Sequence, residues 1–225
     1  MNRTLTLARI RRTAYVGTQR AYAPLLTALV LVLVARVSGS SEPDSAYAFS
    51  AALLFAVFAW QAKAVLDTEP DEQRMLGRLA VGSADREIAA GLLAPLVPTL
   101  PILLAALVAP LLGALLGQSG EGLLEWVGFG LWIHLISMFS GTAVGALTSR
   151  AVISSRAWAI SIQVLVFLGV LVLGSRPEPF LRWWVPQLVD VSGIDLVTGL
   201  LISVHAMAWS GIVFLGYVRL RRRRA

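Results

Sequence analysis

The sequence predicts an all-α integral membrane protein with six transmembrane helices, and three observations support that fold class. Of the 225 residues, 57% are hydrophobic and 14% are charged, with a mean hydropathy of +0.74, whereas soluble domains carry roughly 25% charged residues. Apolar stretches of about 20 residues, the length that crosses a bilayer, recur along the chain. The Lys and Arg residues fall in alternate connections between these stretches, as the positive-inside rule predicts for a multi-pass protein.

The apolar stretches define six predicted spans, at residues 20–37, 47–66, 88–117, 124–148, 157–174 and 194–218. The third stretch is too long for a straight crossing, and prolines interrupt it at positions 95, 98, 101 and 110. Each proline removes a backbone donor and favours a bend, so we expect a broken or strongly tilted helix there. Together the six spans make residues 1–225 a single transmembrane domain.

The distribution of basic residues predicts the orientation. If the N-terminus is cytoplasmic, sixteen of the nineteen Lys and Arg residues lie in cytoplasmic segments, where such residues are retained. These are Arg3, Arg9, Arg11, Arg12, Arg20, Lys63, Arg74, Arg78, Arg86, Arg150, Arg156, Arg219 and Arg221 to Arg224; Arg36, Arg176 and Arg182 lie outside. We therefore expect both termini in the cytoplasm and a multi-pass protein of the cell (plasma) membrane.

The first 19 residues predict a helix that lies in the headgroup region. In this segment Leu5, Leu7, Ile10, Tyr15 and Val16 alternate with arginines, as in an interfacial amphipathic helix. A cleavable signal peptide is the alternative for the basic start and first apolar run. The five further spans and the length of the basic segment favour the interfacial helix.

The sequence contains none of the motifs that would make this chain an enzyme. It has no GxxxxGK[ST] loop for ATP, no HExxH pair and no cysteine for a disulfide or thiolate metal site. Ser140 and His205 resemble the serine and histidine of rhomboid proteases, but their predicted depths differ by about 7 Å. We expect no catalytic, metal or cofactor site in this chain. The net charge of +6 is explained by anionic lipid at the span ends and not by nucleic acid.

Two spans carry small and polar residues along one helix face. In the fourth span these are Gly130, His134, Ser137, Gly141, Gly145 and Thr148, at spacings of three or four. Such a face permits close helix packing, and a role in lining a pathway is the second interpretation. In the second span Tyr47, Ser50, Leu54, Phe58 and Gln61 share a face, with packing or substrate contact as its two possible roles.

The loop at 67–87 is the longest predicted cytoplasmic connection, with six acidic residues and three arginines. Pro70 and Asp71 suit the start of a helix, and Glu72 in its first turn complements the helix dipole. Met75, Leu76 and Leu79 form a small apolar face, Gly82 can end the helix, and Ser83 can cap the next one. The loop therefore predicts a short amphipathic helix at the cytoplasmic surface.

The segment RPEPFLRWWVPQLVDVSG, residues 176–193, is long, amphipathic and aromatic. It forms most of the predicted extracytoplasmic connection at 175–193. Phe180, Trp183 and Trp184 would lie at the outer interface, which aromatic rings prefer. An ordinary aromatic belt and a half-inserted, re-entrant-like segment both account for these residues.

The residues of the charged loop and the third span resemble the membrane (permease) subunits of type-2 ATP-binding-cassette (ABC) exporters. The resemblance rests on Glu72, Arg74, Leu76, Leu79, Gly82 and Ser83, Glu87 and Gly91, together with the six spans. The chain lacks the proline often found at the turn of this motif, and Leu92 stands where a lysine commonly follows the third-span glycine. In this family an interfacial helix precedes the first span and a half-inserted segment lies on the exit side.

The resemblance implies a transport subunit and not an enzyme. A coupling helix between the second and third spans would dock on a separate ABC ATPase subunit that binds ATP and Mg, and a second, identical or related permease would complete the pathway. The implied coupling residues are Asp71, Glu72, Arg74, Met75, Leu76, Arg78 and Leu79; the pathway candidates are Tyr47, Ser50, Phe58, Gln61, His134 and Ser137. The apolar interior suits a hydrophobic or amphipathic drug, natural product, peptide or lipid. A secondary transporter and a membrane scaffold or sensor subunit remain the alternatives.

Overall fold

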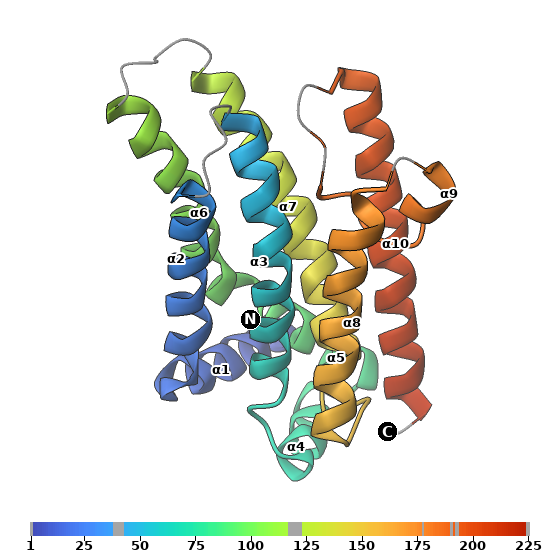
Figure 1. Cartoon of the computed structure of the whole chain (residues 1–225). Helices are drawn as coiled ribbons and strands as arrows, with labels where there is room; N and C mark the ends of the chain where they lie inside the picture. Colours follow the sequence, from blue (N-terminus) through green and yellow to red (C-terminus); the bar gives the residue numbers. More distant parts are fainter. Residues whose placement is uncertain are drawn as a thin grey trace.

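The computed structural model describes residues 2–37, 43–116, 123–176, 178–189, 191 and 194–223. Every regular element within these ranges is helical (Figure 1). The helices are α1 (Arg3–Gly17), the 3₁₀ turn η1 (Gln19–Ala21), α2 (Tyr22–Val37), α3 (Pro43–Leu66), α4 (Asp71–Val81), α5 (Ala84–Leu93), α6 (Leu96–Leu116), α7 (Leu123–Leu147), α8 (Arg156–Gly174), α9 (Pro179–Arg182) and α10 (Leu196–Arg223). Of the positions in the predicted elements and the predicted cytoplasmic arginines, 1, 117, 177, 190, 192, 193 and 224 lie outside the described residues.

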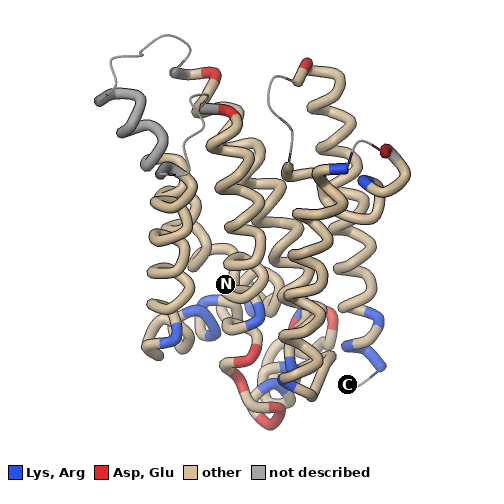
Figure 2. The backbone as a smooth tube through the Cα atoms, in the orientation of Figure 1, with Lys and Arg blue, Asp and Glu red and all other residues tan. Residues whose placement is uncertain are grey.

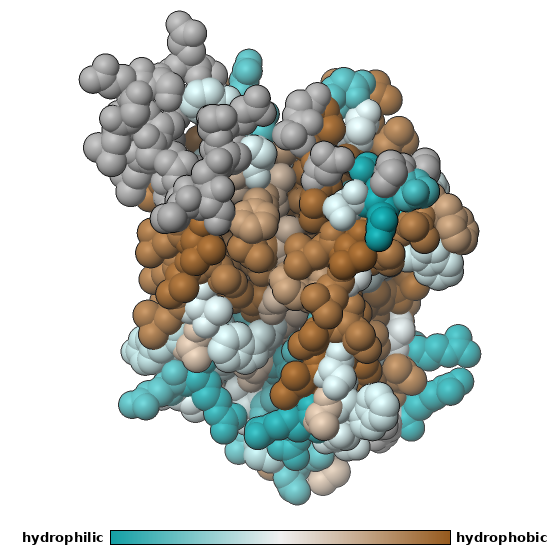
Figure 3. Space-filling view, in the orientation of Figure 1, coloured by the Kyte–Doolittle hydropathy of each residue, from teal (hydrophilic) through white to brown (hydrophobic). Residues whose placement is uncertain are grey.

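The lengths and composition of these helices fit a multi-pass membrane protein. Five segments are long and apolar enough to cross a bilayer: α3, α5 with α6, α7, α8 and α10. The 16-residue α2 meets the same criterion only together with α1, which joins it at a bend of 84°. The described residues thus contain five candidate spans, or six if the bent pair counts as one. Figure 3 shows the corresponding band of apolar side chains between hydrophilic ends.

The third predicted span is broken, as its prolines led us to expect. α5 ends at Leu93, Ala94 and Pro95 form a turn, and α6 begins at Leu96. Pro98 lies in the first turn of α6, where a missing N–H costs nothing because that group has no helical partner. The helix also continues through Pro101. The break therefore occurs at one proline and not at all four.

The centre of the bundle is the pair α3 and α7, which pack along their length (Figure 1). α2 and α6 cover α3 on one side, α10 packs on α7, and α8 contacts α3. Side chains of α3, α7, α8 and α10 form one core cluster that includes Phe55, Ile133 and Val170. A second cluster joins α2 and α6 to the other side of α3 and includes Val32, Phe58 and Ile102. α8 and α10 are largely exposed, with only 17% of their apolar windows buried, so lipid or another chain must cover them.

Most Lys and Arg residues gather at one end of the bundle, where α1, α4 and the C-terminal end of α10 lie (Figures 1 and 2). We refer to this as the basal end. Within the described part of the chain this end also holds most of the acidic residues (Figure 2), whereas α9 and the C-terminal end of α8 lie toward the opposite end (Figure 1). α4 projects beyond the other helices at the basal end (Figure 1), and this position makes it accessible to a partner.

The N-terminal helix differs from the predicted amphipathic surface helix. Leu7 and Tyr15 are buried, but Leu5, Ile10 and Val16 are each more than half exposed, so the apolar residues do not share one face. α1 instead packs on α5, α4 and α3 at the basal end. Its contribution to the fold is therefore to brace the loop region, in addition to any contact with lipid.

Candidate functional site

The candidate site is the exposed face of α4. At about 100° per residue, Glu72, Leu76 and Leu79 point away from the buried side of the helix. The side chains of Met75, Leu76 and Leu79 are 62%, 62% and 72% exposed. Exposed apolar side chains of this size on a charged surface mark an interaction site.

The local sequence fixes where α4 starts and stops. Pro70 precedes the first residue, Asp71, and Asp71 and Glu72 complement the positive end of the helix dipole. Gly82 ends the helix with φ at 72°, a left-handed conformation that glycine adopts without steric cost. Its N–H donates to the carbonyls of Arg78 at 2.9 Å and Leu79 at 3.2 Å. These features hold α4 to eleven residues between α3 and α5.

Arg74 attaches α4 to the end of α3. Its side chain, which we expected on the coupling surface, is buried together with Gly77 and Val81. The guanidinium group donates to the Leu66 carbonyl oxygen at 2.5 Å and to Asp71 Oδ1 at 3.0 Å. Burial, with a smaller contribution from the nearby Arg221 charge, lowers the pKa of Arg74, while Asp71 opposes that shift. Arg74 thus positions the helix and is not available for direct contact with a partner.

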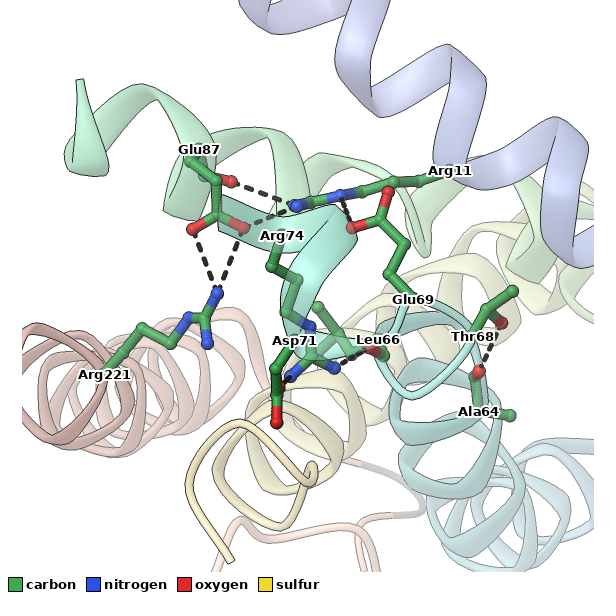
Figure 4. Close-up of polar contacts among 9 residues, drawn as sticks. All are labelled: Arg11, Ala64, Leu66, Thr68, Glu69, Asp71, Arg74, Glu87 and Arg221. Carbon is green, nitrogen blue, oxygen red and sulfur yellow. Dashed lines mark hydrogen bonds and ion pairs between the residues drawn. The ribbon is translucent and has the colours of Figure 1, made fainter. Parts of the chain in front are cut away.

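A buried carboxylate, Glu87 at the start of α5, connects two further elements, α1 and α10 (Figure 4). Arg11 of α1 donates to Glu87 Oε1 at 2.5 Å and to the Glu87 carbonyl oxygen at 3.0 Å. Arg221 of α10 donates to both Glu87 carboxylate oxygens at 3.1 Å. Arg11 also pairs with Glu69, in the loop before α4, at 2.6 Å. We call Arg11, Glu69, Glu87 and Arg221 the basal ion network.

The basal ion network makes α4 part of a braced unit. Its two central side chains, Arg11 and Glu87, are only 5% and 6% exposed, and charge-assisted hydrogen bonds at low exposure hold their partners in fixed geometry. The network therefore joins α1, α5, α10 and the loop before α4. Arg74 in turn joins α4 to the end of α3 through the Leu66 carbonyl. A force applied to the exposed face of α4 would reach several spans through these contacts.

A cavity of about 380 Å³ lies beside α4. Its lining residues come from α4, α5, the connection after α7 and the end of α10, and include Asp71, Arg74, Arg78, Glu87, Arg150 and Arg221. Arg74 and Arg221 are paired with Asp71 and Glu87, so much of its charge is internally balanced. The cavity separates α4 from the connection after α7 on one side.

The six predicted pathway residues lie in or beside the interface between α3 and α7. Tyr47, Ser50, Phe58 and Gln61 of α3 and His134 and Ser137 of α7 are all at most 2% exposed. His134 Nδ1 lies 2.7 Å from the Gly130 carbonyl oxygen, and Nε2 lies 3.1 Å from Ser50 Oγ. Ser137 Oγ donates to the Ala51 carbonyl oxygen at 2.6 Å. In this arrangement the residues pack the two helices together.

The predicted packing glycines lie where α7 approaches α3 most closely. A Cβ atom at Gly141 would be 2.6 Å from the Phe55 carbonyl oxygen, and one at Gly145 would clash with the Ala59 carbonyl oxygen. At Gly130 the obstruction is the Tyr47 ring, at 2.7 Å. The backbones could not approach this closely with larger residues, which is the physical use of small residues in membrane helix pairs.

The aromatic residues between α8 and α10 lie along α10. Phe180, Trp183 and Trp184 are 72%, 69% and 64% exposed. The Trp183 carbonyl oxygen lies 3.1 Å from His205 Nε2, and the Trp184 carbonyl accepts from Trp209 Nε1 at 3.0 Å. His205 is nine residues after Leu196, about 14 Å along the helix. The segment thus returns from the end of α8 along the side of α10 (Figure 1).

The serine and histidine of the protease-like pattern are not partners. Ser140 Oγ lies 3.0 Å from Ser210 Oγ, whereas His205 Nε2 lies within hydrogen-bond distance of the Trp183 carbonyl oxygen. Among the described residues, no three His, Asp or Glu side chains are grouped closely enough to hold a metal ion. The geometry supports no nucleophilic site at Ser140.

No protein-family model, curated protein or solved structure matches this chain.

Few sequence features indicate the basal ion network. Arg11 and Arg221 were expected to flank spans and face lipid, but Arg11 is buried and Arg221 reaches Glu87 across 134 positions of sequence. The available signal was Glu69 and Glu87, two of the six acidic residues in the predicted loop at 67–87. Such residues at a positively charged end are candidates for structural pairing.

Proposed function

We propose that this chain is the transmembrane permease subunit of an ABC exporter, driven by a separate ATPase subunit. The observation that carries the proposal is α4, whose Met75, Leu76 and Leu79 are exposed beyond the ends of the spans while Arg74 fixes its other face. A helix with an exposed apolar face and a fixed opposite face can bind a partner and transmit the partner's motion to the rest of the chain. The resemblance of residues 72–91 to type-2 exporter permeases supplies the class of partner.

In the proposed orientation the basal end faces the cytoplasm, because it holds most of the Lys and Arg residues (Figure 2). Binding of ATP and Mg by the partner would close two ATPase subunits and displace α4. Through Arg74 and the basal ion network, that displacement would move α3, α5 and α10 and change access to the pathway. Two permease chains would form this pathway for a hydrophobic or amphipathic compound.

Co-purification tests this proposal. The tagged chain is extracted from its native membrane in mild detergent, its partners are identified by mass spectrometry, and ATP hydrolysis is measured. We expect an ATPase subunit with a P-loop to co-purify and to be lost from the Leu76→Asp/Leu79→Asp variant, because two carboxylates would be buried without partners in the interface.

The matched control is Gln73→Asp/Ala80→Asp, which adds the same charge to exposed positions on the flank of α4. It should retain the ATPase. If the wild-type chain instead retains a partner without ATPase activity, and the α4 variant loses it, the scaffold or sensor alternative replaces the exporter. If no partner depends on α4, the assignment of its exposed face is wrong.

A further inference from the structure

A second cavity, of about 660 Å³, lies at the basal end between α3 and α8. It is separate from the exposed face of α4. The side chains that characterise it are Arg20 of η1, Trp60 and Lys63 of α3, Arg150 of the connection after α7, and Arg156 and Ile160 of α8. It therefore combines basic groups from four elements with apolar groups from two spans.

The charges lining this cavity are unbalanced. Its one acidic residue is Asp67, which pairs with Lys63 and accepts the Arg150 backbone N–H at 2.7 Å. Within the part of the chain that the structure describes, the guanidinium groups of Arg20, Arg150 and Arg156 have no carboxylate partner, and all three residues are exposed. Four cations and one carboxylate leave three positive charges at the cavity.

The remaining lining residues indicate where an anionic ligand would come from. Trp60 and Ile160 are 40% and 50% exposed on two membrane-spanning helices. Tryptophan prefers the level of lipid headgroups, and arginine matches phosphate oxygens in bidentate hydrogen bonds. A phosphate held by the arginines would leave acyl chains free to lie against the apolar surface that Figure 3 shows above the basal end.

We propose that this cavity binds the phosphate-bearing head group of an anionic glycerophospholipid. Arg20, Arg150 and Arg156 contact the phosphate, and Trp60 and Ile160 contact the glycerol and the first acyl carbons. The proposal requires only that the chain spans a membrane. It holds whether or not α4 binds an ATPase.

Native mass spectrometry of the delipidated protein in detergent tests the site. Phosphatidylglycerol and phosphatidylcholine are titrated separately, and retained lipid is counted. We expect one phosphatidylglycerol bound about tenfold more tightly than phosphatidylcholine, and an affinity about tenfold lower in Arg150→Gln/Arg156→Gln, because charge-assisted hydrogen bonds are lost. The control Arg3→Gln/Arg9→Gln removes the same charge from exposed positions of α1 and should change the affinity less than about twofold.

The outcomes separate the possible ligands. Equal retention of both lipids by the wild-type protein, or equal phosphatidylglycerol affinity in the two glutamine variants, would overturn the proposal. If glycerol 3-phosphate binds as tightly as phosphatidylglycerol and displaces it, the ligand is a soluble phosphate and the lipid assignment is wrong. Circular dichroism checks folding, and Arg150→Lys/Arg156→Lys, which keeps the charge, should bind more tightly than the glutamine variant.

Discussion

At the scale of single residues, two features determine how closely the elements approach: glycines without side chains and a carboxylate shared by two arginines. Gly145 lies where α7 meets the Ala59 carbonyl of α3, and Glu87 lies between Arg11 and Arg221. Substitution of Gly145 or Glu87 should therefore lower the stability of the protein. The same kind of substitution at a similar residue without these contacts should not.

We expect Gly145→Ala to destabilise the protein by about 1–3 kcal/mol, because the added methyl group must push the α3 backbone away. Gly128 provides the control, since a Cβ atom there would meet nothing within 4 Å. Gly128→Ala should be neutral or slightly stabilising. The measurement is the midpoint of thermal unfolding in detergent, and equal midpoints for the two variants would contradict the close approach of α3 and α7.

Replacing Glu87 by Gln should cost about 3 kcal/mol, because the buried Arg11 and the partly buried Arg221 would lose their shared counter-ion. The matched control is Asp85→Asn on the same helix. Asp85 pairs with Arg222, and the two side chains are 65% and 58% exposed, so the loss should be at most about 0.5 kcal/mol. Denaturant unfolding in detergent distinguishes the two, and similar losses would mean that Glu87 does not brace the basal end.

At the scale of elements, α4 is a short helix whose order depends on its attachment. Arg74→Gln should remove the bond to the Leu66 carbonyl and increase local opening of α4. Hydrogen–deuterium exchange over residues 71–81 should then be faster in Arg74→Gln than in Gln73→Ala, which changes an exposed side chain of the same helix. Unchanged protection in both variants would show that Arg74 does not anchor α4.

The elements also show what sequence patterns can predict. Composition and local signals predicted the apolar helices, the start of α4 at Asp71 and its end at Gly82, because spans and helix caps depend on nearby residues. The turn at Pro95 was expected, but the sequence did not distinguish it from the other three prolines. The burial of Arg11 and Arg74 was missed, because it depends on contacts between residues that are distant in sequence or across a loop.

At the scale of the whole molecule, the fold predicts which segments lie on the same side of a membrane. The chain has no cysteine, so single-cysteine variants can be labelled without background. Met75→Cys should be inaccessible to a membrane-impermeant maleimide in intact cells, whereas Leu124→Cys and Leu196→Cys, at the opposite end, should be labelled. All three residues are exposed. Labelling of Met75→Cys from outside would reverse the proposed orientation.

The central claim is that α4 contacts an ATPase, and a photocrosslink at Leu79 tests it most directly. A benzoylphenylalanine replaces Leu79, the most exposed large apolar residue of α4, and adducts formed in native membranes are identified by mass spectrometry. We predict an adduct with a P-loop ATPase subunit at Leu79 and none at Leu196, which is exposed at the other end of the bundle. Adducts at Leu79 that contain only lipid or a protein without a nucleotide-binding motif would contradict the account.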